Sequence, residues 1–214
     1  MTIADLGLLL ATGLFAGFLG GLFGIGGGIA IVPALYAVLG ANGVPEEVRI
    51  KIAVGTSLAT IILTSIRSVQ GHLRHGNVDT ALIKSWGPFI AMGAIGGAAL
   101  ARYLDASILT LIFGGVLFML GVHLSGLPAQ RGIATGIGTL SSLMGKGGGV
   151  LSVLVLTRAG RPVHEAIGTS AGFGLFIGLP GAIGYAVAGL GDAATGPGTL
   201  GYISLPAFVA IALG

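Results

Sequence analysis

The segment Gly24-Ile25-Gly26-Gly27-Gly28 interrupts an apolar run near the N-terminus, and Gly145-Lys146-Gly147-Gly148-Gly149 interrupts another past the midpoint. Glycine accounts for 42 of the 214 residues, so a single triple glycine, expected about once or twice by chance, is a weak motif. Each break, however, is followed by a short apolar run, a polar turn containing proline, and then Gly-Thr-Ser, at 55–57 and at 168–170. The same order in both copies predicts an internal repeat.

The composition predicts that the chain lies in a lipid bilayer. Hydrophobic residues make up 54% of the sequence, charged residues 8%, and the mean hydropathy is +1.01. A water-soluble domain carries about a quarter of its residues as charges. The net charge of +3 is too small and too dispersed for a nucleic-acid partner. Cysteine is absent, which excludes disulfides and thiolate metal sites.

Length divides the chain into full crossings and shorter helices, because a crossing needs roughly 20 apolar residues. We expect crossings at 52–69, 86–101, 108–124 and 166–188, a polar loop at 67–84, and a last helix from near Tyr202. Shorter apolar runs flank the glycine breaks, at 6–23 and 29–39 and again at 132–144 and 150–157. These predict two broken or re-entrant helix pairs that reach the middle of the bilayer. Pro45 and Pro162 mark the expected starts of the two helices that contain Gly-Thr-Ser.

Counting the crossings predicts the topology. Three crossings separate the glycine breaks, so the second pair enters from the opposite face and the repeats are inverted. The chain is therefore expected to be an all-α polytopic membrane protein, with a first repeat at 1–125 and a second at 126–214 that is incomplete at its C-terminus. One face carries Arg49, Lys51 and Arg102, and the other carries Arg67, Arg74, Lys84, Arg131, Arg158 and Arg161. The positive-inside rule makes the second face cytoplasmic and places the N-terminus outside.

Opposed broken helices would bring bare glycine backbone and helix N-termini together at the bilayer midplane. Such ends attract anions, because their amides are unpaired and carry partial positive charge. Hydroxyl groups nearby would add neutral donors. The predicted substrate-binding residues are Gly26, Gly27, Gly28, Thr56, Ser57, Lys146, Gly147, Gly148, Gly149, Thr169 and Ser170. The structural alternative is that the glycines are packing notches and that each hydroxyl bonds to its own helix carbonyls.

Lys146 is the one charge within its apolar region, and ionisable groups at membrane depth are candidates for function. The alternative is a lysine that extends to a cytoplasmic vestibule. An intramembrane serine hydrolase using Ser57 or Ser170 is disfavoured, because all four histidines lie in or beside loops. We expect no enzyme activity, no cofactor and no metal site.

The glycine motif at 24–28, followed by Val32-Pro33 and then Gly55-Thr56-Ser57, resembles the signature of the TauE/SafE sulfite-exporter family, the TSUP anion permeases. The resemblance covers about 14–208. It implies a membrane permease for sulfite, sulfonates such as sulfoacetate, or related organic anions, with the glycine runs and Gly-Thr-Ser elements around the substrate. The second copy departs from the pattern, with Val153-Leu154 in place of Val32-Pro33.

Together these features predict a multi-pass transporter of small sulfur oxyanions or organosulfonates in the cell inner membrane, working by alternating access. A passive anion channel or a membrane assembly factor is the alternative. The expected partners are the small anion and the lipid bilayer. The Gly/Ala-rich face of 86–101 could serve internal packing or a homodimer.

Overall fold

The computed structural model describes residues 2–23, 27–101, 103–105, 107–109 and 149–214. Two expected helices, at 108–124 and 132–144, and the link between the halves fall mainly or wholly outside these residues. In chain order the described elements are α1 (Ile3–Phe23), α2 (Gly28–Ala41), α3 (Glu46–Arg74), α4 (Thr80–Ala101), α7 (Gly149–Arg158), α8 (Val163–Ala188), η1 (Ala193–Thr195), β1 (Thr199–Leu200), β2 (Ile203–Ser204) and α9 (Leu205–Leu213). The prediction of a helical chain is confirmed.

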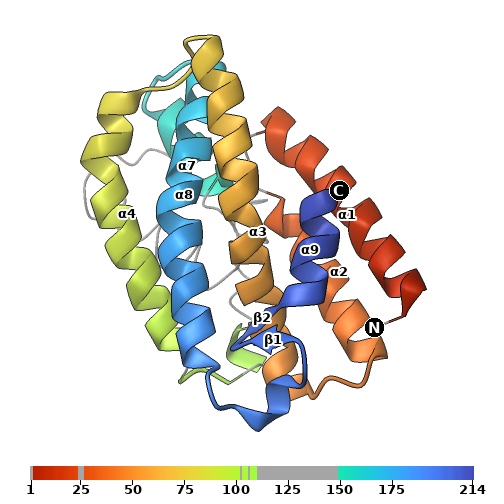
Figure 1. Cartoon of the computed structure of the whole chain (residues 1–214). Helices are drawn as coiled ribbons and strands as arrows, with labels where there is room; N and C mark the ends of the chain where they lie inside the picture. Colours follow the sequence, from red (N-terminus) through yellow and green to blue (C-terminus); the bar gives the residue numbers. More distant parts are fainter. Residues whose placement is uncertain (1, 24–26, 102, 106, 110–148) are drawn as a thin grey trace.

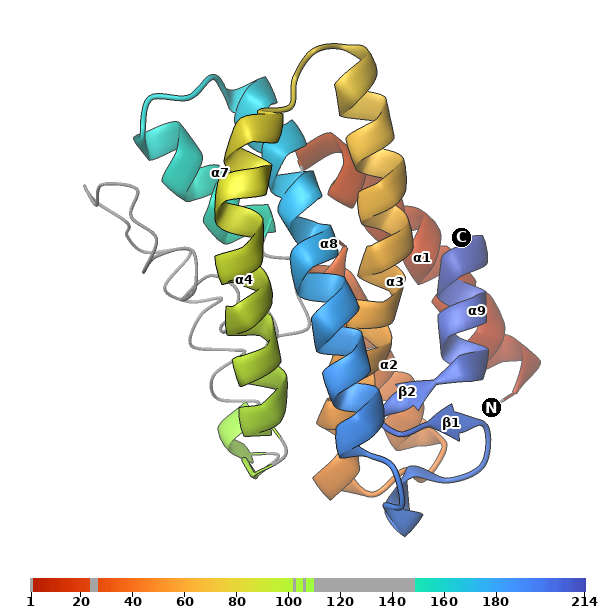
Figure 2. The same cartoon turned by 60° about the vertical axis from the view of Figure 1, so that its left-hand side comes forward.

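Two long helices, α3 and α8, form the centre of the fold. They pack side by side, with α4 against α8 and with α2 and α9 against α3 (Figures 1 and 2). Among the described helices these two are long and apolar enough to cross a bilayer. At about 1.5 Å per residue, their 29 and 26 residues exceed the hydrocarbon thickness of roughly 30 Å.

The two central helices run antiparallel, as the contacts of one glycine from each helix show. A Cβ placed on Gly178 would lie 3.1 Å from the carbonyl oxygen of Leu58, near the middle of α3. A Cβ on Gly55 would lie 3.0 Å from the Cβ of Tyr185, near the end of α8. Glycine at these positions therefore permits the close approach of the helices.

The predicted helix starts are confirmed at both proline turns. Pro45 and Pro162 precede α3 and α8 with the same backbone angles, φ −55° and ψ 141°. Glutamates follow in each first turn, Glu46 and Glu47 in α3 and Glu165 in α8. Proline has a φ suited to a helix start, and carboxylates there favour the positive end of the helix dipole.

Two predicted boundaries are wrong. The segment 67–84 is not one loop, since α3 continues to Arg74 and the chain turns only at 75–79. Basic side chains in its last turn are stabilised by the negative helix end, so this helix outlasts its apolar stretch. The last helix begins at Leu205 rather than near Tyr202, because residues 199–204 form a short antiparallel hairpin, with Thr199 opposite Ser204.

Candidate functional site

Within the described residues, two helices start at the last glycine of the two motifs. Gly28 is the first residue of α2 and Gly149 is the first residue of α7, and both are buried. The amides of a helix's first turn have no partner within the helix. Four of the predicted site residues, Gly26, Lys146, Gly147 and Gly148, lie outside the described residues.

Gly27 shapes the entry to α2. Its φ of +36° lies in the left-handed region, and its carbonyl accepts hydrogen bonds from the amides of Ala30 and Ile31, at 3.0 and 3.1 Å. No side chain caps this helix end. A Cβ at Gly27 would lie 3.3 Å from that of Ala16 in α1, so a larger residue would be both strained and crowded. The α2 N-terminus is thus buried, against Ile31 and Ala16.

The first Gly-Thr-Ser element docks on the hairpin that precedes α9. The amide of Ser204 donates to Thr56 Oγ1 at 2.9 Å, and both residues are buried. A Cβ on Gly55 would overlap the carbonyl oxygen of Tyr202. The amide of Tyr202 in turn donates to the carbonyl of Tyr185 at 3.2 Å. Helix α3, in the first half of the chain, therefore binds the hairpin 199–204 from the second half.

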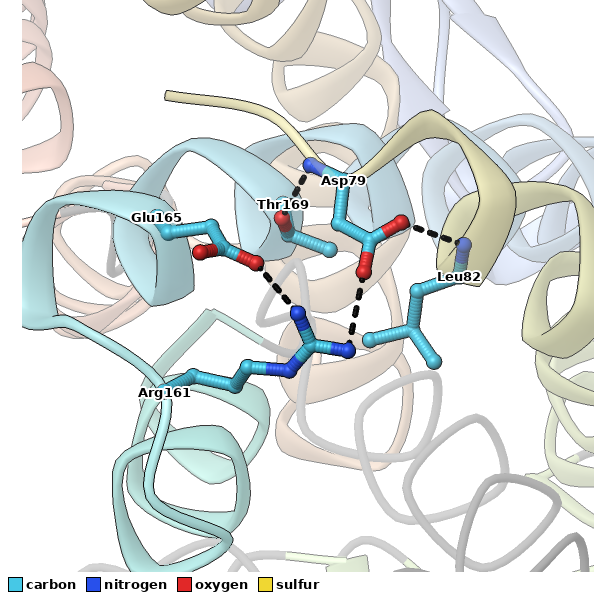
Figure 3. Close-up of polar contacts among 5 residues, drawn as sticks. All are labelled: Asp79, Leu82, Arg161, Glu165 and Thr169. Atoms are coloured by element: carbon cyan, nitrogen blue, oxygen red, sulfur yellow. Dashed lines mark hydrogen bonds and ion pairs between the residues drawn. The ribbon is translucent and has the colours of Figure 1, made fainter. Parts of the chain in front are cut away.

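The second Gly-Thr-Ser element makes equivalent contacts, with the roles of the two halves exchanged. The amide of Asp79 donates to Thr169 Oγ1 at 2.9 Å (Figure 3). A Cβ on Gly168 would overlap the carbonyl oxygen of Asn77, whose amide donates to the carbonyl of His72 at 3.0 Å. The segment before α4 thus docks on α8 as the segment before α9 docks on α3. We call residues 75–79 and 199–204 the return segments, since each follows one of the two central helices. Each half of the chain binds the return segment of the other.

The serine of the second copy follows the structural alternative. Ser170 Oγ donates to the carbonyl of Ile167 at 2.8 Å, within its own helix. Ser57 and Ser170 are fully buried, like the two threonines. The threonine hydroxyls, by contrast, accept from backbone amides of distant segments. Sequence reasoning placed all four near substrate and missed these partners, since they lie 148 and 90 residues away in the chain.

An ion-pair cluster lies beside Thr169 at one end of the molecule. The Arg161 guanidinium, in the turn between α7 and α8, lies 3.1 Å from Asp79 Oδ2 and 2.7 Å from Glu165 Oε1 (Figure 3). Asp79 Oδ1 also accepts from the amide of Leu82 at 2.8 Å, which caps α4. The side chain of Arg161 is 45% exposed and that of Asp79 is 17% exposed. The cluster ties the turn after α7 to the start of α4. Sequence reasoning did not find it, although Arg161 and Glu165 have the i, i+4 spacing of a helical ion pair.

Comparison with known proteins identifies the family. The sequence profile described as Sulfite exporter TauE/SafE matches residues 9–214. A "Probable membrane transporter protein" of Haemophilus influenzae is 37% identical over 95% of this chain and 82% of its own length. The "Probable membrane transporter protein MJ0441" of Methanocaldococcus jannaschii is 30% identical over 96% of this chain and 80% of its own. No solved structure matches the chain. With this match over nearly its whole length, the chain belongs to the TauE/SafE sulfite exporter family, and it is a membrane transporter rather than an enzyme.

Proposed function

We propose that the chain carries small sulfur oxyanions, sulfite or an organosulfonate, across the cell inner membrane by alternating access. The observation that carries this proposal is the pair of helices, α2 and α7, that begin at the last glycine of a repeated motif with their first residues buried. Each start offers backbone amides and the positive end of a helix dipole, which suit an oxyanion. A family whose description names sulfite export agrees with this chemistry.

The reciprocal docking of α3 and α8 supports an inverted repeat. The helices are antiparallel, and Thr56 and Thr169 each bind the return segment of the other half. An inverted pair would place the starts of α2 and α7 on opposite approaches to one midplane site. Alternating access then follows from rocking one half against the other. On this reading the N-terminus lies outside, as the positive-inside rule predicts.

Within this site we assign the principal contacts to glycine amides. Thr56 and Thr169 already accept backbone hydrogen bonds at 2.9 Å, so their first role is to hold the two halves in register. A hydroxyl that accepts one bond keeps its own proton for another partner. Lys146 would add a positive charge to the second glycine motif, beside the first residues of α7.

Flux of radiolabelled sulfite into proteoliposomes tests the proposal, with sulfonates and carboxylates as competitors. A carrier gives flux that saturates with sulfite concentration, shows counterflow and is competed by sulfonates. Flux that rises linearly without counterflow would indicate a passive channel instead. The absence of movement for every anion in the panel would overturn the proposal. In the same assay, Lys146→Gln should reduce flux if the ammonium faces the anion, whereas unchanged flux would assign the site to the amides alone.

A further inference from the structure

Ser152 carries a buried hydroxyl that has no partner. It is the fourth residue of α7, its side chain is 0% exposed, and its Oγ makes no hydrogen bond. Among the described residues, two other buried side-chain oxygens, those of Ser68 and Tyr185, also make no hydrogen bond. Buried polar groups in native proteins are nearly always paired. This unpaired buried hydroxyl therefore points to a partner that the described residues do not supply.

The usual solution for a hydroxyl in a membrane helix is a bond to its own backbone, and Thr157 in the same helix shows it. Thr157 Oγ1 lies 2.8 Å from the carbonyl oxygen of Val153 and 3.1 Å from that of Leu154. Ser152 makes no such bond. The difference lies in position, because Ser152 is in the first turn of α7, beside the amides that the helix leaves unpaired.

The first copy shows where a side chain at this position points. Aligning Gly28 with Gly149 aligns Ile31 with Ser152, since each is the fourth residue of its helix. Ile31 is also buried, and its Cδ1 would lie 3.1 Å from a Cβ placed on Gly27. The side chain thus reaches back to the glycine break, as the tilt of helical side chains toward the N-terminus requires. By the same tilt, we expect the Ser152 hydroxyl to lie toward the N-terminal end of α7.

We propose that Ser152 Oγ–H donates a hydrogen bond to the oxyanion bound at the start of α7, and so acts as a specificity-determining residue. This inference rests on the proposed function. It makes the substrate site asymmetric, with a hydroxyl in the second half where Ile31 gives the first half an apolar wall. A hydrogen bond to an ionised acceptor is roughly twice as strong as a neutral one, so the hydroxyl favours ligands that present an anionic oxygen.

The test measures sulfite binding as thermal stabilisation of the purified protein, and sulfite flux in proteoliposomes, for Ser152→Ala and Thr157→Val. Both variants remove one hydroxyl from α7, but only Thr157 loses a bond within the helix. Without sulfite, Ser152→Ala should melt at the wild-type temperature or above it, because the deleted group was unpaired. Its half-saturating sulfite concentration should rise about tenfold, the size expected for one charge-assisted bond. Thr157→Val should keep the wild-type sulfite dependence. Ser152→Cys, similar in shape but with a larger sulfur atom that is only a weak donor, should resemble the alanine variant.

A wild-type half-saturation in Ser152→Ala would overturn the inference. So would a lower melting temperature with unchanged sulfite dependence, which would make the hydroxyl a structural group. The two proposals fail in different measurements. The proposed function fails if wild-type protein shows no saturable response to any anion of the panel, whereas the role of Ser152 fails in the comparison between wild type and variant.

Discussion

Gly168→Ala should be among the most damaging single-methyl substitutions in this chain. The new Cβ would overlap the carbonyl oxygen of Asn77 and would lie 2.9 Å from the Cβ of His72. Backbone cannot rotate away as a side chain can, so α8 and the segment before α4 must separate. Overpacking of this kind costs about 1–3 kcal/mol. The separation also stretches the bond from the Asp79 amide to Thr169, at about 1 kcal/mol. The expected loss of stability is therefore about 2–4 kcal/mol.

Gly71→Ala in α3 is the matched control. Nothing lies within 4 Å of a Cβ at this position, and the residue is exposed. Alanine is preferred over glycine in a helix interior by about 1 kcal/mol, so this variant should equal or exceed the wild-type stability. The two substitutions add the same methyl group and should have opposite signs.

Fluorescence of Trp86, the only tryptophan in the chain, provides the assay. Its ring in α4 stacks on that of Phe173 in α8, with centroids 6.1 Å apart and planes 9° from parallel. Its emission therefore reports the separation of α4 from α8 as the detergent-solubilised protein is heated. By the scaling of soluble domains of this size, Gly168→Ala should melt roughly 5–15 °C below wild type. If Gly168→Ala melts within about 2 °C of wild type, or if Gly71→Ala loses as much stability, the close approach of Gly168 to Asn77 would be refuted.

Five further substitutions test the polar contacts. Thr56→Val leaves the buried amide of Ser204 without an acceptor, and Thr169→Val does the same to the part-buried amide of Asp79; each should cost about 1–3 kcal/mol by the same melting assay. Thr64→Val removes only a bond to its own helix and should cost less. Equal losses in all three variants would contradict the docking role of the two threonines. Arg161→Gln should lower stability by under about 1 kcal/mol, because the Arg161 side chain is 45% exposed. This loss should shrink in about 1 M salt, where charges are screened over roughly 3 Å. A larger loss that does not depend on salt would contradict this. Asp79→Ala should be more damaging than Arg161→Gln, since it also removes the cap on α4, worth about 1 kcal/mol, and the reverse order would count against the cap.

Local signals predicted the fold where structure depends on neighbouring residues. Sequence alone could predict the proline turns at Pro45 and Pro162 and the start of α2 at Gly28, because capping and backbone freedom act within one helical turn. Apolar length also located the centres of α3 and α8. It did not locate the end of α3, because polar residues continue a helix once it emerges from an apolar layer.

The candidate site was predictable only as a set of residue types. The duplicated Gly-Thr-Ser indicated that these positions act as pairs, but not what they bind. The partner of Thr56 is the backbone amide of Ser204, in the hairpin 199–204 that no local pattern predicted. Every backbone has such an amide, so its position depends on the tertiary fold alone. Ser152 was overlooked because a serine among apolar residues gives no signal until its missing partner is seen.

The late position of Ser204 in the chain bears on how the protein is made. A ribosome adds about 5–20 residues per second, so roughly 7–30 s separate Thr56 from an amide partner 148 residues later. During that interval α3 is in the bilayer with its close-packed notch at Gly55 unfilled. An N-terminal fragment released before the hairpin is complete would keep this notch open. The packing of α3 at Gly55 and Thr56 is thus completed only after residues 202–204 have been synthesised.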